Sequence, residues 1–250
     1  MNFRFLIPVY IFLLTAAMFG WWYSAPEQMI FSGGLLIIGY FAAAWWLTSE
    51  RNDWWCFALT PVLLALASIS FGLLIPGSWL LGLMLAIVTI LEAVYWGYAF
   101  RYASHSPAYQ PFSLERLSAS FHFLTIFFVA ATAFGLRTYL DFPFSLIAPI
   151  FSALVCVLVL QWIWVSKTSF SKSWRFGLVA ALVVIETAYV ATFFPLDYRL
   201  LGFLVASTYY AIMYLVASST AGTLTKRQLR LIAAVIVLCW LAVFLSGRWL

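Results

Sequence analysis

Landmark residues recur in this chain about 115 to 120 positions apart, and this spacing predicts a four-helix unit written twice. Pairs of small residues four positions apart lie near the beginning and end of each copy: Ala16/Gly20 and Gly82/Ala86 in the first, Ala131/Gly135 and Gly202/Ala206 in the second. Between these pairs, Trp55-x-Phe57-x-Leu59 corresponds to Trp174-x-Phe176-x-Leu178. The offset drifts slowly, as small insertions in the connecting loops would make it do.

A second register competes with this one. Ser78-Trp79-x-x-Gly82-Leu83 resembles Ser173-Trp174-x-x-Gly177-Leu178, and Glu92 then falls close to Glu186. This register pairs helices of opposite direction over a single span and needs a gap inside a helix. The longer register covers four helices and places its gaps in loops, so it is the one we favour.

Apolar runs of about 20 residues, long enough to cross the hydrocarbon core of a bilayer, recur throughout the chain. With 66% hydrophobic and 8% charged residues and a mean hydropathy of +1.03, the composition excludes a soluble domain. The runs are too long and too uniformly apolar for the strands of a membrane barrel. They predict nine helices, at about 5–22, 29–47, 54–75, 78–100, 118–139, 144–165, 175–194, 199–217 and 231–247.

These runs predict an all-α polytopic integral membrane protein with about nine transmembrane helices. Residues 1–117 form the first four-helix repeat, residues 118–217 form the second, and residues 218–250 add a cytoplasmic loop and one C-terminal helix. Each repeat has an even number of helices, so the halves are expected to be parallel and related by a pseudo-twofold axis along the membrane normal. A ligand site is then expected at the membrane midplane, between the halves.

Lys and Arg predict the orientation, because cytoplasmic segments carry an excess of both. With the N-terminus in the cytoplasm and the C-terminus outside, ten fall inside: Arg4, Arg51, Arg101, Arg116, Lys167, Lys172, Arg175, Lys226, Arg227 and Arg230. Three fall outside: Arg137, Arg199 and Arg248. The formal charge of +5 therefore reflects topology in a bacterial-type inner or plasma membrane and contact with anionic lipid, and no nucleic-acid partner is expected.

Small residues and tryptophans predict how the helices meet one another and the lipid. In hydrocarbon, close backbone approach at Gly and Ala provides the contact area between helices, so the four small-residue pairs are expected at helix–helix contacts. The chain is rich in Trp, with 13, and most of them fall at predicted helix ends, where aromatic residues form interfacial belts.

Two carboxyl groups lie deep in the apolar runs and are the main candidates for function. Glu92 is about 13 Å along its helix from Arg101, and Glu186 is about 16 Å from Arg175. A charge at such depth costs roughly 2.5–3.5 kcal/mol, so it marks a functional site by default. Tyr95 and Tyr189 follow three residues later on the same helix faces. The carboxyls are therefore interpreted either as proton-coupling or ligand-binding groups, or as neutral acids whose hydrogen bonds lock two helices.

The sequence contains no catalytic motif, no metal-ligand spacing and no cofactor motif, so neither an enzyme nor a cofactor is expected. His122 has no second His or Cys at ligand spacing, and the three cysteines lie singly within apolar runs. We expect a small transporter or permease for an apolar or amphipathic substrate, and the first interpretation of the carboxyls would make its transport proton-coupled. The alternative is a non-catalytic subunit or scaffold of a larger membrane complex, with other membrane subunits or a second copy as partners.

Overall fold

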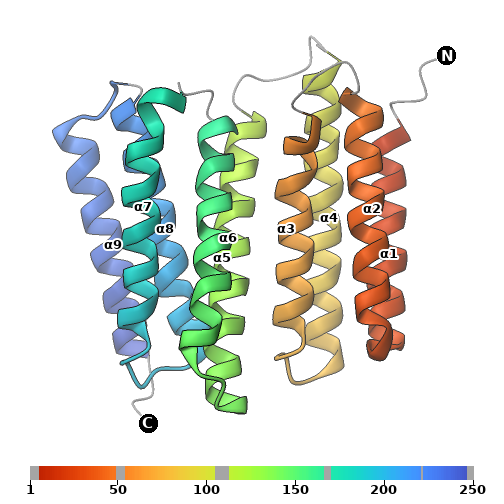
Figure 1. The fold of residues 1–250 in the computed structure, drawn as a ribbon, viewed down its shortest axis with the longest axis horizontal. Helices are drawn as coiled ribbons and strands as arrows, with labels where there is room; N and C mark the ends of the chain where they lie inside the picture. The colour runs from red at the N-terminus through yellow and green to blue at the C-terminus, as the bar shows by residue number, and fades with distance from the viewer. Residues whose placement is uncertain (1–5, 49–53, 105–112, 166–169, 221, 247–250) are drawn as a thin grey trace. The chain divides into compact units, whose positions relative to one another are not determined.

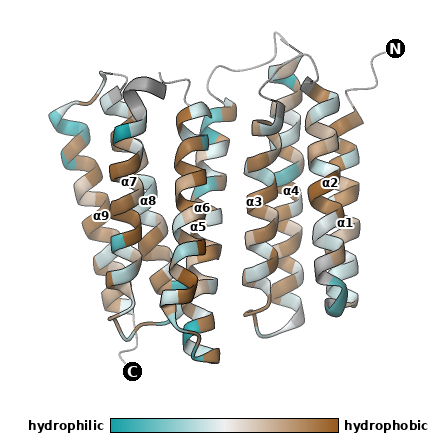
Figure 2. Cartoon of the chain, viewed as in Figure 1, coloured by the Kyte–Doolittle hydropathy of each residue, from teal (hydrophilic) through white to brown (hydrophobic). Residues whose placement is uncertain are grey.

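The structure, a computed structural model, describes residues 6–48, 54–104, 113–165, 170–220 and 222–246 (Figure 1). Within these ranges it contains nine α-helices and no strand. Eight of the helices are long and apolar enough to cross a membrane, and α2 contributes a shorter apolar stretch, Phe31–Leu47. Hydrophobic residues predominate along the helices (Figure 2). The chain therefore has the structure of a multi-pass helical membrane protein.

The first compact unit runs from Met1 to Phe121 and contains four complete helices and the start of a fifth. The four are α1 (Ile7–Ser24), α2 (Met29–Thr48), α3 (Trp54–Gly72) and α4 (Ser78–Ala103), and a short 3-10 turn, Pro26–Gln28, joins α1 to α2. Helix α1 packs on α2 and α4, and α3 also packs on α2 and α4. These contacts close a four-helix bundle.

The second compact unit runs from His122 to Leu250. Its helices are α5 (Ser113–Leu140, which starts in the first unit), α6 (Phe144–Val165), α7 (Phe170–Ala191), α8 (Tyr198–Thr220) and α9 (Lys226–Ser246). Helix α7 packs between α6 and α8, and α9 packs on α8. Helix α5 meets α8 through Phe123 and Phe203 and meets α6 through Phe134 and Phe144, with ring centroids 6.1 Å apart in both pairs.

Three helices, α5, α7 and α9, each begin five residues earlier than the hydrophobic runs predict, because polar first turns extend them. Helix α5 begins at Ser113 instead of 118, and Glu115 in its first turn complements the positive end of the helix dipole. Helix α9 begins at Lys226 instead of 231. Just before it, the Gln228 amide N–H donates to the Thr225 hydroxyl and the Thr225 amide N–H donates to the Gln228 side-chain oxygen. This reciprocal capping box fixes where the helix starts.

Burial separates central from peripheral helices. In α3, 72% of the apolar window is buried, whereas in α9 the share is 11%. Helix α3 is therefore a core helix of the first unit, and α9 presents most of its surface to its surroundings. Of the charged residues used for the orientation, Arg4, Arg51, Lys167 and Arg248 lie outside the described residues.

Candidate functional site

Glu92 lies in the core of the first unit. Its side chain is completely buried, and neither carboxylate oxygen accepts a hydrogen bond from any described residue. Buried polar groups in native proteins nearly always have a partner, so each exception calls for an explanation. A buried carboxyl group without one is the least expected feature of this bundle and the first candidate for a site.

Aromatic and hydroxyl side chains from neighbouring helices surround the buried carboxyl. Tyr40 of α2 and Tyr95 of α4 are both close enough to Glu92 to interact with it electrostatically. Trp96 lies between the two tyrosine rings, with centroids 6.1 Å from each. The Tyr40 hydroxyl is held at 2.7 Å from the Thr15 hydroxyl of α1, which directs it to that partner. Glu92 thus has neighbours on α2 and α4, one of which is held in place by α1.

The Tyr95 hydroxyl is committed to the backbone of α3. It donates to the Phe57 carbonyl oxygen at 3.2 Å, with Thr60 and Ser118 as its other polar neighbours. In a regular helix the Phe57 carbonyl accepts from the amide N–H of residue 61, but Pro61 has no N–H to give. Tyr95 therefore supplies the hydrogen bond that the proline removes. This arrangement differs from the sequence-based alternative in which Tyr95 bonds Glu92.

Removing the Tyr95 hydroxyl is expected to destabilise the bundle more when Pro61 is present than when it is replaced. Tyr95→Phe removes one donor from a carbonyl that Pro61 already deprives of its backbone partner, at a cost of about 0.5–1.5 kcal/mol. In a Pro61→Ala background the backbone amide satisfies the same carbonyl, so the second substitution should cost clearly less. A double-mutant cycle on thermal unfolding in detergent measures the coupling. Equal costs in both backgrounds would show that the hydroxyl serves some other group.

Glu186 occupies a different environment in the second unit. Its side chain is exposed on α7, and within the described residues it makes no hydrogen bond or ion pair. It lines a groove of about 390 Å³ between α6 and α7, together with Ala148, Ser152 and Tyr189. Tyr189 is 57% exposed, so it does not enclose the carboxyl. The two carboxyls that the sequence singles out thus belong to separate units, one buried and one on a helix surface.

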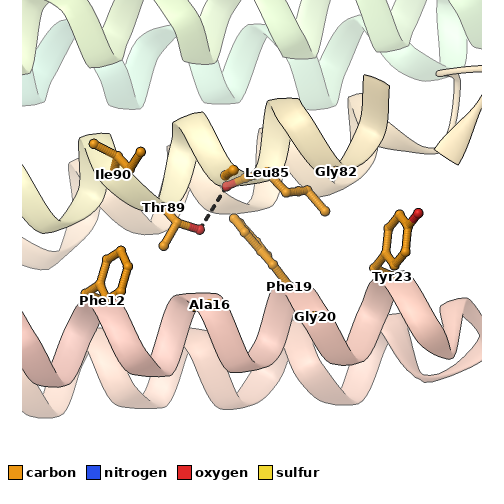
Figure 3. A pocket seen from close by; sticks show the side chains of 10 residues that line it. Phe12, Ala16, Phe19, Gly20, Tyr23, Gly82, Leu85, Thr89 and Ile90 are labelled. Carbon is orange, nitrogen blue, oxygen red and sulfur yellow. Dashed lines mark hydrogen bonds between the residues drawn. The ribbon is translucent and has the colours of Figure 1, made fainter. Parts of the chain in front are cut away.

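The small-residue pairs behave differently in the two units. In the second unit Ala131, Gly135, Gly202 and Ala206 are all buried, and a Cβ added to Gly202 would lie 2.9 Å from the backbone nitrogen of Ala131. In the first unit Ala16, Gly20 and Ala86 are exposed and Gly82 is half-buried. They line an apolar groove of about 330 Å³ between α1 and α4, flanked by Phe12 and Tyr23 (Figure 3).

At the floor of this α1/α4 groove lie Phe19, Leu85 and Thr89 (Figure 3). Thr89 is buried, and its hydroxyl donates to the Leu85 carbonyl at 2.8 Å. Three residues further along α4 comes Glu92, on nearly the same side of the helix. The floor of the groove is therefore about one helical turn from the buried carboxyl.

His122 forms a separate buried polar contact in the second unit. Its Nδ1 lies 3.4 Å from the Tyr209 hydroxyl of α8, and its Nε2 has no hydrogen-bond partner among the described residues. Sequence reasoning gave this histidine little weight and did not single out Tyr40 or Thr15. The position of Pro61 four residues after Phe57 was a usable signal for the Tyr95 contact, since it removes the backbone N–H that would otherwise donate to the Phe57 carbonyl.

No cluster of three or more His, Cys, Asp or Glu side chains suited to a metal ion occurs within the described residues. Cys56, Cys156 and Cys239 form no disulfide within the described residues. Comparison with known proteins finds no matching family model, no matching curated protein and no matching solved structure. Any function must therefore be argued from the geometry of the chain itself.

Proposed function

We propose that the chain is a small membrane transporter in which Glu92 carries the coupling proton. The observation that carries the proposal is the burial of this carboxyl group without a hydrogen bond from any described residue. An ionised carboxylate in such surroundings is strongly unfavourable, so the group binds a proton while the bundle is closed. If a second conformation opens the pocket to water, the same group releases that proton. The closed bundle is then the occluded state of an exchange cycle.

The hydrogen-bond geometry favours this proposal over a structural lock. The nearest tyrosine hydroxyls are both engaged elsewhere, Tyr40 with Thr15 and Tyr95 with the Phe57 carbonyl. In a structural role, the Glu92 carboxyl would form hydrogen bonds to another helix. Such interhelical hydrogen bonds are what allows a polar side chain to stabilise a membrane protein. Without them Glu92 lowers the stability of the bundle, which is typical of residues kept for function.

The α1/α4 groove supports the proposal that the substrate is apolar or amphipathic and enters from the lipid. Its exposed lining, Phe12, Ala16 and Gly20, faces outward from the first unit, and its floor reaches Thr89, one turn from Glu92. A hydrophobic molecule dissolved in the bilayer can reach such a groove without crossing water. The groove is the entrance that we propose for the substrate.

Chemical modification with dicyclohexylcarbodiimide tests whether Glu92 exchanges protons. This apolar reagent attacks protonated carboxyl groups that it can reach from the lipid or from water. A carboxyl group that is reachable only when the bundle opens should react slowly, and its rate of modification should fall as the pH rises. Peptide mapping by mass spectrometry should find Glu92 modified in intact membranes, more slowly than the exposed Glu186, which serves as internal control. A Glu92 that stays unmodified while Glu186 reacts fully would mean that the site never opens.

Transport itself is tested in proteoliposomes with an imposed pH gradient. Wild-type protein is expected to drive uptake of amphipathic fluorescent probes, and Glu92→Gln is expected to reduce this uptake to the level of protein-free liposomes. Gln keeps the size of Glu but cannot titrate. The matched variant Glu186→Gln changes an exposed carboxyl and should retain uptake. Equal uptake by wild type and Glu92→Gln would refute the coupling role.

We also propose the parallel four-plus-four repeat and the orientation with the N-terminus in the cytoplasm. Two helix pairs support the repeat: α1 lies against α4 in the first unit, and α5 approaches α8 closely at Ala131 and Gly202 in the second. A reporter fused after Leu250 should be outside, and one inserted near Pro107 should be cytoplasmic. Both reporters on one side would contradict the nine-helix topology.

A second candidate function is that of a non-catalytic subunit of a membrane complex. It is favoured by the exposure of Glu186 within an apolar helix and by the exposed surface of α9. Both features are typical of surfaces that another protein covers. Purification in mild detergent separates the candidates: a subunit should retain other polypeptides in fixed ratio, and a transporter should not.

A further inference from the structure

Two neighbouring side chains in the core of the first unit have buried polar atoms without a partner. Both carboxylate oxygens of Glu92 and the indole N–H of Trp96 form no hydrogen bond with a described residue, and both side chains are completely buried. Residues 92 and 96 lie one turn apart on the same face of α4. Buried polar groups are nearly always hydrogen-bonded, so such neighbours indicate a place that a ligand or an ion can join.

Aromatic rings surround this carboxyl group. Tyr40 and Tyr95 are close enough to Glu92 to interact with it electrostatically. The ring centroid of Trp96 lies 6.1 Å from that of each tyrosine. Both tyrosine hydroxyls are held by other groups of the chain, so the rings are the part of these side chains that a ligand can use. The face of an aromatic ring attracts cations, and that of tryptophan does so most strongly.

The described part of the first unit offers no counter-charge to an ionised Glu92. Its described arginines, Arg101 and Arg116, are exposed, and Arg101 is about 13 Å further along α4. No lysine occurs in the sequence of this unit. Ionisable groups inside a membrane are normally paired, because an isolated charge there is unfavourable. When Glu92 releases its proton, a cationic ligand is therefore the partner that can compensate its charge, and an anionic ligand is repelled.

We propose that the substrate is a lipophilic organic cation that exchanges with the proton on Glu92. This assignment rests on the proposed proton exchange at Glu92. As the cation binds, its charged centre pairs with the ionised carboxylate next to Trp96 and one proton leaves, so the total charge of the site is unchanged. The apolar body of the substrate is suited to the α1/α4 groove, whose volume of about 330 Å³ lies in the range of small-molecule sites. The floor of that groove, at Thr89, is one turn from Glu92.

Equilibrium binding of tetraphenylphosphonium to the purified protein in detergent tests this assignment without requiring transport. Tetraphenylborate is the matched control, because it has nearly the same size and shape and the opposite charge. Calorimetric titration near neutral pH, repeated in buffers of different ionisation enthalpy, gives the affinity and the number of protons released. Wild type is expected to bind the cation with release of close to one proton, and to bind the anion no better than empty micelles do.

The source of the released proton can be identified. The other titratable groups near Glu92 or Tyr95 are Tyr40 of α2 and Cys56 of α3, together with Tyr95 itself. Tyrosine and cysteine side chains keep their protons at neutral pH. Glu92→Gln should therefore abolish proton release, and it should weaken binding of the cation roughly 30-fold or more, because one partner of a buried charge pair is lost. Glu92→Asp keeps the charge and should keep proton release.

A pair of tryptophan variants tests the aromatic contact. Trp96→Leu should weaken binding of tetraphenylphosphonium about two- to 30-fold. Trp22→Leu is the matched control, because Trp22 is also buried with its N–H unpartnered among the described residues, but it lies against Gly72 near the ends of α1 and α3. It should bind the cation as wild type does. Thermal unfolding of each variant gives the folded fraction to which the binding is referred.

Three results would overturn the assignment: no binding of the cation, binding without proton release, or equal binding by wild type and Glu92→Gln. The last two would indicate adventitious association with the apolar surface. If proton-driven uptake depends on Glu92 but is found only for neutral or anionic probes, the transport function holds and the substrate class is wrong. If the cation binds with proton release but no probe is transported, the cation site holds and the transport function is wrong.

Discussion

Replacing Glu92 with leucine is expected to raise the thermal unfolding midpoint of the protein. The carboxyl is completely buried and accepts no hydrogen bond from a described residue, so its removal relieves an unpaired polar group. The gain should be about 1–3 kcal/mol, and a chain of this size shifts by roughly 2–4 °C for each kcal/mol. Proton-driven uptake should be lost in the same variant. Unfolding in detergent, followed by tryptophan fluorescence, measures the first effect.

Two companion variants make the Glu92 result specific. Glu92→Gln keeps a polar group at the same place, so its midpoint should stay near wild type although uptake is lost. Thr89→Val lies one turn away and removes a hydroxyl that is already bonded to the Leu85 carbonyl, so it should give no comparable gain. A fall in stability for Glu92→Leu would mean that the carboxyl bonds across helices and belongs to the scaffold.

Adding one methyl group to Gly202 is expected to destabilise the second unit, whereas the same change at Gly82 should leave the first unit as stable as before or slightly more stable. A Cβ at Gly202 would come within 2.8 Å of the Ala131 side chain and 3.0 Å of its Cα, and backbone atoms cannot easily move away. Overpacking of this kind costs about 1–3 kcal/mol. At Gly82 the new Cβ would meet only Tyr23, at 3.9 Å. There the better helix propensity of Ala can contribute up to about 1 kcal/mol.

These two glycines are matched by the longer repeat register, so the pair of variants compares one sequence position in two settings. Thermal unfolding of Gly202→Ala and Gly82→Ala, each measured against wild type, gives the difference directly. Equal effects would indicate that α1 and α4 approach each other as closely as α5 and α8 do, with no open groove in the first unit.

The helices of this protein could be predicted from sequence because hydrophobic runs of membrane length are unambiguous. Their ends were less accurate where polar turns extend them. The Thr225 and Gln228 capping box was present in the sequence and would have placed the start of α9 correctly. The first turn of α5, with Glu115, carried a similar signal.

The environment of each carboxyl could not be predicted in the same way. A soluble helix reveals its buried face by the periodicity of its apolar residues, but helices that are apolar on all sides give no such signal. Glu92 and Glu186 therefore looked equivalent in depth and in their tyrosine neighbours, although one is buried and the other exposed. The same reason explains why Ala16 and Gly20 were expected at a close helix contact and line an open groove instead.

Helix α3 has a consequence for how the protein is inserted into the membrane. With Pro61 in its interior, α3 has no backbone N–H for the Phe57 carbonyl, and backbone groups left unsatisfied in hydrocarbon cost several kcal/mol each. One donor to this carbonyl belongs to Tyr95 on the next helix, after a connection of only residues 73–77. Helices α3 and α4 are thus best inserted together, as a hairpin that leaves the translocon with this bond already formed.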